Sequence, residues 1–318
     1  MDTPTNTAIS EAEVGSKIAI KYFKPQTIKV KGDTDQKEAE ILILPDGIGG
    51  MTAQSVKKFT DEYKTAPDFR TGTAQMLTLD SFINHVNRFK DEDSIIFADN
   101  SREKPSLKAV IDYHKKTFKG QPRNGDHKVT YTFPMSDEWK AWMDLDGQSM
   151  TLIEFAEFLE DRIGDVEVPP VLNNENEDDS DADTHLKMLL ERIGGNLAGP
   201  QKLMELSKGL KINVEEKVHQ AHTLASGETQ LQFSHEHKDD QGAPIKVPNM
   251  FLINIPVFNS GDVFRIPVRL RYRVKAGSIS WTYQLYRTDQ TFDTAFDDAV
   301  KKVEEDTELP VHVGKVES

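Results

Sequence analysis

The stretch RIPVRLRYRVKAGSISWTYQLYR, residues 265–287, decides what kind of sheet this chain builds. Basic residues occupy alternate positions in its first half, with mostly apolar residues between them. Successive side chains of a β-strand point to opposite faces, so the pattern predicts one cationic and one apolar face. The basic residues, which we call the basic stripe, are Arg265, Arg269, Arg271, Arg273 and Lys275.

The turn at Ala276 and Gly277 decides which residues lie opposite the basic stripe. A two-residue turn places polar residues opposite the basic ones and forms four apolar pairs on the other face. These pairs are Val274 with Ile279, Tyr272 with Trp281, Leu270 with Tyr283, and Val268 with Leu285. A three-residue loop with a bulge at Gly277 would instead put the arginines on one face with Trp281 and Tyr283. Such a mixed face would resemble a stacking platform for single-stranded nucleic acid.

We favour the two-residue turn on energetic grounds. Burying a large apolar side chain stabilises a fold by roughly 1.5–3 kcal/mol, and the amphipathic register buries four such pairs. An alanine with positive φ costs about 1 kcal/mol, which is the smaller term. The cationic face then has two interpretations. Acidic residues of the same fold or of a neighbouring subunit pair with it, or it binds a polyanion, with Arg287 contacting phosphate and Tyr286 stacking on a base.

The rest of the chain predicts an α+β fold with antiparallel sheets, flanking helices, a mixed N-terminal half and a strand-rich C-terminal half. Strand patterns cover 17–23, 27–32, 39–45, 94–100, 107–114, 127–133, 212–224, 228–238, 249–258, 262–274 and 279–287. Helical spacing covers 51–64, 78–90, 136–143, 151–163, 184–210 and 291–306. Thr151 and Glu154 form a capping-box pattern, and glycines within 194–199 predict a two-part helix.

The distribution of charge suggests where the chain divides into regions, and the absence of cysteine limits the kinds of site it can form. The net charge is −14, and residues 165–183 contain eight acidic residues and no basic one. We therefore expect a disordered lead at 1–16, a mixed α+β region at 17–164, an acidic linker at 165–183, and a helix, antiparallel sheet and C-terminal helix at 184–318. The chain has no cysteine, which excludes disulfides and thiolate sites. No apolar run is long enough for a membrane helix.

No motif predicts a catalytic centre, and we expect no cofactor. The glycine-rich segment 44–54, LPDGIGGMTAQ, does not match a phosphate loop and is interpreted as a turn leading into a capped helix. Asp146 and Gly147 lack calcium-loop spacing and are interpreted as a turn. His235 and His237 would share one strand face and are weak candidates for a metal site, since zinc needs three or four ligands.

Several stretches resemble the YfdQ-like phage and prophage proteins, a family of unknown function. They include LPDG at 44–47, SFINHV with IIFAD within 81–99, AVIDYH at 109–114, and DEWKAWM with EFAEFLED within 137–161. NMFLINIPVF and RLRYRV follow in the second half. The resemblance implies that the protein acts in the cytoplasm of a bacterial host. The family has no established catalytic or binding residues that could be assigned to positions in this chain.

These observations favour a non-enzymatic phage or prophage accessory protein that acts by binding and self-association. A homo-oligomer is expected, because the basic stripe and the acidic run of two copies attract each other. A nucleic-acid-binding accessory of phage recombination or replication is the first alternative, and a shell or capsid-like subunit the second. A host or phage protein is a further possible partner, and no membrane association is expected.

Overall fold

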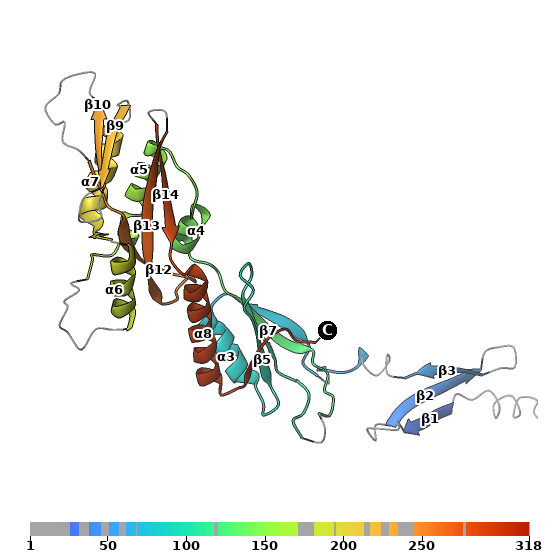
Figure 1. Cartoon of the computed structure of the whole chain (residues 1–318). Helices are drawn as coiled ribbons and strands as arrows, with labels where there is room; N and C mark the ends of the chain where they lie inside the picture. Colours follow the sequence, from blue (N-terminus) through green and yellow to red (C-terminus); the bar gives the residue numbers. More distant parts are fainter. Residues whose placement is uncertain are drawn as a thin grey trace, which may run out of the picture. The chain divides into compact units, whose positions relative to one another are not determined.

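The structure is a computed structural model of the whole chain, and Figure 1 shows its elements. It describes residues 26–31, 38–45, 51–56, 62–67, 69–117, 120–170, 181–193, 195–212, 217–223, 229–234, 245–275 and 278–317. The expected strand at 17–23 and the disordered lead at 1–16 lie outside these residues. The chain divides into two compact units, residues 1–70 and 71–318, which are described separately.

The first unit contains a three-stranded antiparallel sheet in the order β1-β2-β3. Its strands are β1 (Gln26–Lys31), β2 (Glu38–Pro45) and β3 (Met51–Ser55). The helix predicted from residue 51 is therefore wrong over β3. Pro45 pairs with Met51 and Ile43 with Ala53, so the glycine-rich residues 46–50 connect two paired strands. The Asp-Gly and Gly-Gly dipeptides are hairpin signals, and here they outweighed the helical spacing.

The second unit begins with a five-stranded mixed sheet in the order β15-β5-β6-β7-β4. Its strands are β4 (Gly72–Met76), β5 (Ile95–Asp99), β6 (Ser106–Val110), β7 (His127–Thr132) and β15 (Val311–Val313). Helix α3 (Leu79–Phe89) packs on β7 and buries Phe82 and Val86. The hydroxyl of Thr78 caps this helix by accepting from the backbone N–H of Ser81.

The second sheet of this unit contains the opening stretch and has the order β14-β13-β12-β8. Its strands are β8 (Leu197–Ala198), β12 (Met250–Pro256), β13 (Val263–Lys275) and β14 (Ser278–Leu285). Lys275 pairs with Ser278, so two residues connect the strands, and all four predicted apolar pairs form. The amphipathic register is confirmed. Trp281 and Tyr283 are fully buried on one face, and Arg271 and Arg273 are exposed on the other.

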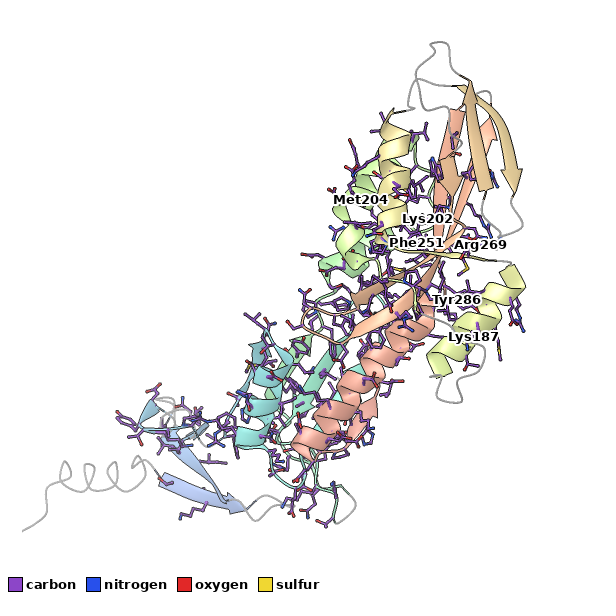
Figure 2. The ribbon with its side chains drawn as sticks, turned by 90° about the vertical axis from the view of Figure 1, so that its left-hand side faces the viewer. Lys187, Lys202, Met204, Phe251, Arg269 and Tyr286 are labelled. Atoms are coloured by element: carbon purple, nitrogen blue, oxygen red, sulfur yellow. The ribbon has the colours of Figure 1, made fainter. Side chains whose placement is uncertain are left out.

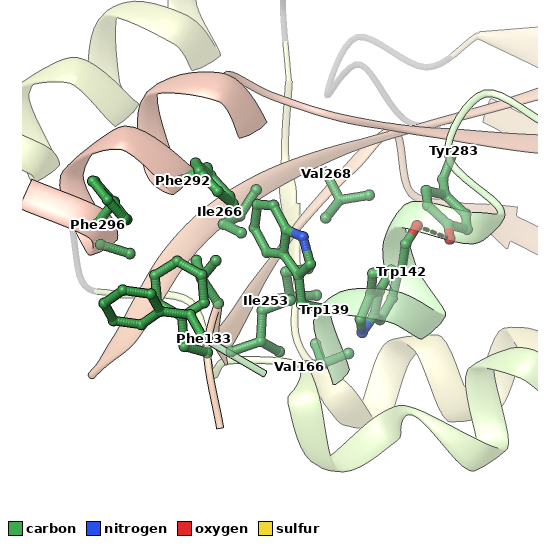
Figure 3. Packing of buried hydrophobic residues seen from close by; sticks show 14 of the residues in the cluster. Phe133, Trp139, Trp142, Val166, Ile253, Ile266, Val268, Tyr283, Phe292 and Phe296 are labelled. Carbon is green, nitrogen blue, oxygen red and sulfur yellow. Dashed lines mark hydrogen bonds between the residues drawn. The ribbon is translucent and has the colours of Figure 1, made fainter. Parts of the chain in front are cut away.

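Helices cover the apolar face of this hairpin. They are α4 (Asp137–Asp144) and α5 (Leu152–Asp161), and α7 (Pro200–Ile212) packs on α5. Phe155 of α5 stacks on Trp281 with ring centroids 5.0 Å apart. The Tyr283 hydroxyl donates to the backbone oxygen of Trp142 at 2.6 Å (Figure 3). The predicted capping box of Thr151 and Glu154 begins α5, and the predicted packing role of Trp139 and Trp142 is confirmed because both are buried.

The predicted two-part helix is confirmed as α6 (Asp181–Ile193) followed by α7, with β8 in the break between them. The predicted acidic linker at 165–183 lies within the second unit, and residues 171–180 are outside those described. The first residues of this 165–183 segment are hydrogen-bonded to β12 of the four-stranded sheet. The short 3-10 helix η1 (Ile163–Asp165) precedes Val166, which bridges to Ile253, and Glu167, whose N–H donates to Leu252. Its end forms the first turn of α6.

Helix α8 (Thr288–Thr307) packs between the five-stranded and the four-stranded sheet of the second unit. Figure 1 shows it beside α3, between the sheets. Phe292 packs edge-on against Phe258, and Phe296 packs against Phe133 of the five-stranded sheet at 5.4 Å. Figure 3 shows one cluster running from Phe296 to Tyr283. A third sheet of this unit contains β9 (Lys217–Thr223), β10 (Thr229–Ser234) and β11 (Ile245–Val247).

The α+β fold class with antiparallel and mixed sheets is thus confirmed. Strands β4, β8, β11 and β15 were not predicted. Among the described residues, no helix has both the length and the apolar character needed to cross a bilayer.

Two buried tryptophans provide a test of the core. The indole N–H of Trp142 donates to the Asp165 carboxylate at 2.8 Å, whereas the indole N–H of Trp281 is buried without a partner. Both Trp→Phe changes remove the same volume from fully buried positions. We expect Trp142→Phe to lower the free energy of unfolding by about 2 kcal/mol more than Trp281→Phe, because only Trp142 loses a hydrogen bond to a charged group. Urea unfolding followed by circular dichroism measures this difference, and equal losses would contradict it.

The pH dependence of stability provides a second test, at His85 of α3. Burial lowers the pKa of His85, and the neighbouring His127 and Arg88 lower it further. The unfolded chain therefore binds a proton at this site at a higher pH than the folded chain does. Stability is fully present above about pH 6.5 and is lost as the pH falls from there through the lower folded pKa. We expect His85→Gln to reduce this loss in thermal unfolding measured between these pH values, and an unchanged slope would contradict the assignment.

Candidate functional site

The candidate site is the polar face of the β13–β14 hairpin. The register places Arg269 opposite Gln284, Arg271 opposite Thr282 and Arg273 opposite Ser280. These neighbours are uncharged, so they neither neutralise nor repel the guanidinium groups. All three arginines are exposed. Alternate residues of a strand are about 6.6–6.8 Å apart, so the arginines form an evenly spaced row.

Arg265 differs from the other arginines of the basic stripe, because it forms an ion pair inside the fold. Its Nε and Nη2 donate to the two carboxylate oxygens of Glu167 at 2.8 and 2.6 Å. This two-point geometry fixes both side chains. Internal pairing with acidic residues, one of the two interpretations from the sequence, is therefore confirmed for Arg265, and it holds the start of the 165–183 segment on the sheet.

The outer arginines of the basic stripe, Arg269, Arg271 and Arg273, show no such pairing. Within the part of the chain that the structure describes, none of them makes an ion pair or a side-chain hydrogen bond. Lys275 ends β13 opposite Ser278, and its side chain lies outside those described. Three cationic groups therefore face outward in one row with their hydrogen-bond donors unused.

Tyr286 and Arg287 lie at the inner end of this row, where the sheet leads into α8. The backbone N–H of Tyr286 donates to Pro267, which keeps the ring on the polar face beside Arg269. Tyr286 is 41% exposed, and the Arg287 guanidinium lies 5.3 Å from its ring centre. Arg287 has a left-handed backbone with φ of 54° and donates to Gln290 of α8. Tyr286 and Arg287, which were grouped with the basic stripe from the sequence alone, thus lie next to Arg269 at the inner end of the row.

A hollow of about 350 Å³ lies between this face and α6. Its walls include Arg269, Gln284 and Tyr286 from the hairpin, Leu189 from α6, and Asp146. Figure 2 shows Arg269 and Tyr286 on the same side of the molecule as Lys187 of α6. Arg269, Gln284 and Asp146 give the hollow polar groups, while Leu189, Met250 and Leu285 give it an apolar wall.

Residues 146–150 cover the outer edge of β14. Gly147 N–H donates to Tyr283, and Met150 and Trp281 exchange two backbone hydrogen bonds at 2.8 Å. The Asp146 carboxylate accepts from the N–H of Leu285 at 2.9 Å. This segment, interpreted as a turn from its sequence, therefore also seals a strand edge. Gly147 has φ of 73°, which favours glycine at this position.

The weak metal candidates His235 and His237 lie outside the described residues. Among those that are described, no group of three metal-binding side chains comes together. The sequence also gave no indication of Glu167, Asp146 or Leu189 at this face. Each reaches it through tertiary contact from a distant segment, which no local spacing encodes.

Comparison with known families gives one match. Residues 17–316 match the family described as uncharacterized conserved protein (DUF2303). The chain belongs to the DUF2303 family. The match spans both units of this DUF2303 protein and includes the whole of the hairpin. Comparison with curated proteins and with solved structures finds no match.

The paired and unpaired arginines should contribute differently to stability. We expect Arg265→Ala to lower the free energy of unfolding by about 0.5–1 kcal/mol, because it leaves the Glu167 carboxylate without its partner. Arg269→Ala and Arg273→Ala should each change it by less than about 0.5 kcal/mol, as is usual for exposed positions. Urea unfolding of the three variants tests this. A loss at Arg273 as large as at Arg265 would reveal an internal partner for the outer row.

Proposed function

We propose that this DUF2303 protein acts by binding and self-association, without catalysis, and that the outer arginines of its basic stripe dock an acidic protein surface. The observation that supports this most directly is the row of three exposed guanidinium groups without an ion pair among the described residues. An exposed row of like charges repels itself, and an acidic partner removes that repulsion on binding. The resemblance to YfdQ-like proteins supports a phage or prophage setting in a bacterial cytoplasm.

A second copy of the chain is the acidic partner that we favour. The net charge is −14, and the 165–183 run contributes eight carboxylates without one basic residue. Arg265 already binds the first part of this run through Glu167 in the same chain. The contact therefore shows the chemistry that a neighbouring copy would repeat at Arg269, Arg271 and Arg273. Exposed ion pairs are screened over about 8–10 Å at physiological salt, so such an assembly is sensitive to salt.

Nucleic-acid binding is the second candidate, and the position of Tyr286 beside Arg269 favours it. A base stacked on Tyr286 would place its phosphates toward the arginine row. The confirmed register limits this candidate, because Trp281 and Tyr283 are buried on the opposite face and offer no stacking platform. Binding would then depend on phosphate contacts and would show little preference for sequence. No particular observation favours the shell-like assembly, which electron microscopy of the purified protein would reveal.

The oligomeric state tests the leading proposal. We expect light scattering after size-exclusion chromatography to show an oligomer at about 50 mM salt that dissociates as salt increases to about 200 mM and beyond. The triple variant Arg269→Ser, Arg271→Ser, Arg273→Ser should be monomeric at low salt. The matched control removes three exposed lysines elsewhere, Lys115→Ser, Lys140→Ser and Lys301→Ser, and should still assemble. A monomer at every salt concentration would rule out self-association.

The same variants separate the two candidates. If the face binds nucleic acid, the wild-type chain retains an oligonucleotide at low salt. The triple arginine variant should then reduce the slope of log affinity against log salt by about 2 to 3 units, since each phosphate contact contributes about 0.7–0.9. If the face binds acidic protein, the wild-type chain retains no oligonucleotide at about 50 mM salt while it still assembles.

A further inference from the structure

A second hollow of the second unit has the opposite charge and lies away from the basic stripe. It measures about 500 Å³ and is formed by α3, the end of β7, the turn after β12 and α8. We call it the acidic cleft. Its charged residues are Asp80 of α3, Asp262 of the turn, and Asp298 and Lys302 of α8. Three carboxylates thus face one ammonium group, so the cleft attracts cations.

The carboxylates of the acidic cleft are not equivalent. Lys302 lies 3.3 Å from Asp80, and this pair is largely exposed. Asp262 and Asp298 are exposed and make no ion pair within the described part of the chain. The turn that presents Asp262 is fixed by a hydrogen bond from Gly261 to Phe258, and Ser260 has a left-handed backbone with φ of 61°. A non-glycine residue in this conformation costs of order 1 kcal/mol, so the surrounding structure holds the turn in place.

The floor of the acidic cleft is aromatic. Tyr131, Phe133 and Phe258 all line it, and consecutive ring centroids are 4.9 and 4.8 Å apart. Leu77 stands at the rim with 89% of its surface exposed. An apolar floor under a charged rim fits a ligand that combines an apolar body with a cationic group. It does not fit a bare metal ion, and the described residues bring no three metal-binding side chains together.

Tyr131 provides an independent indication of a ligand. Only 4% of its surface is exposed, yet its hydroxyl makes no hydrogen bond with a described residue. Burial raises the pKa of Tyr131, and the Asp80 carboxylate raises it further, so the hydroxyl keeps its proton and remains a donor. The hydroxyl oxygen is not among the enclosed polar atoms, so it reaches solvent at the floor of the cleft, where a bound group can accept from it in place of water. A peptide carbonyl is such an acceptor.

We propose that the acidic cleft binds a short cationic segment of a partner protein, in which a lysine or arginine stands next to an aromatic or aliphatic residue. The cation lies between Asp262 and Asp298, the apolar side chain rests on Phe133 and Phe258 beside Leu77, and a backbone carbonyl accepts from Tyr131. This site is independent of the proposed function, because the basic stripe attracts acidic partners and the acidic cleft attracts basic ones. The chain therefore presents two docking surfaces of opposite charge.

Fluorescence anisotropy with the full-length chain tests this site. The probe is a labelled hexapeptide of alternating lysine and phenylalanine, and its counterpart replaces lysine with glutamate. We expect binding of the cationic peptide only. The double variant Asp262→Asn, Asp298→Asn should weaken binding about five- to tenfold, since two exposed charge contacts are lost. Tyr131→Phe, which removes only the hydroxyl, should weaken it about two- to fivefold.

The matched control is Asp297→Asn, Asp306→Asn, which removes the same charge from exposed positions of α8 that do not line the acidic cleft. It should bind as the wild type does. These substitutions are nearly isosteric, and thermal unfolding checks that each variant folds. Equal affinity in all variants, or equal affinity for both peptides, would overturn the proposal. If the peptide instead dissociates an oligomer, and the cleft variants abolish that oligomer, then a second copy's basic stripe is the occupant and the proposal is overturned.

Discussion

The pairing of β13 with β14 is the constraint on which the rest of the second unit depends. Because Lys275 pairs with Ser278, the four apolar cross-strand pairs of the hairpin lie on one face, including the fully buried Trp281 and Tyr283. Fixing these two rings also fixes α4 and α5, through the hydrogen bond from Tyr283 to Trp142 and the stacking of Phe155 on Trp281. A shift by one residue would expose both rings and bury arginines, which costs far more than any turn penalty.

The same pairing explains why the arginines along the cationic face differ in whether they have an acidic partner. At its inner end, Arg265 is bound by Glu167, because the chain after α5 runs along β12 and brings that carboxylate to the sheet. Farther out, the residues opposite the arginines are serine, threonine and glutamine, which contribute no charge. The fold therefore pairs the arginine nearest its core, and within the described residues the three outer ones make no ion pair. The charges of the acidic cleft do not come from one strand. Its carboxylates come from α3, α8 and a turn, and these three segments meet over aromatic rings.

The sequence predicted local structure well wherever one periodicity dominated. The hairpin register, the capping box at Thr151 and the break between α6 and α7 all follow from short-range patterns. The prediction failed at β3, where helical spacing competed with the hairpin signal of residues 46–50. The members of the candidate site on β13 were predictable because they alternate along one strand. Glu167, Asp146 and the cleft around Tyr131 were not, because distant segments bring them together only after the chain has folded.

Both edges of the four-stranded sheet are occupied over part of their length. Residues 146–150 hydrogen-bond along β14, while β8 and the segment at Val166 and Glu167 occupy the free side of β12. The backbone at these positions is already hydrogen-bonded, so a partner strand cannot pair there, and covering a strand edge in this way limits edge-to-edge association. What the covered part of the sheet offers to its surroundings is the row of side chains on its open face, and contacts made through those arginines would depend on charge and salt rather than on backbone pairing.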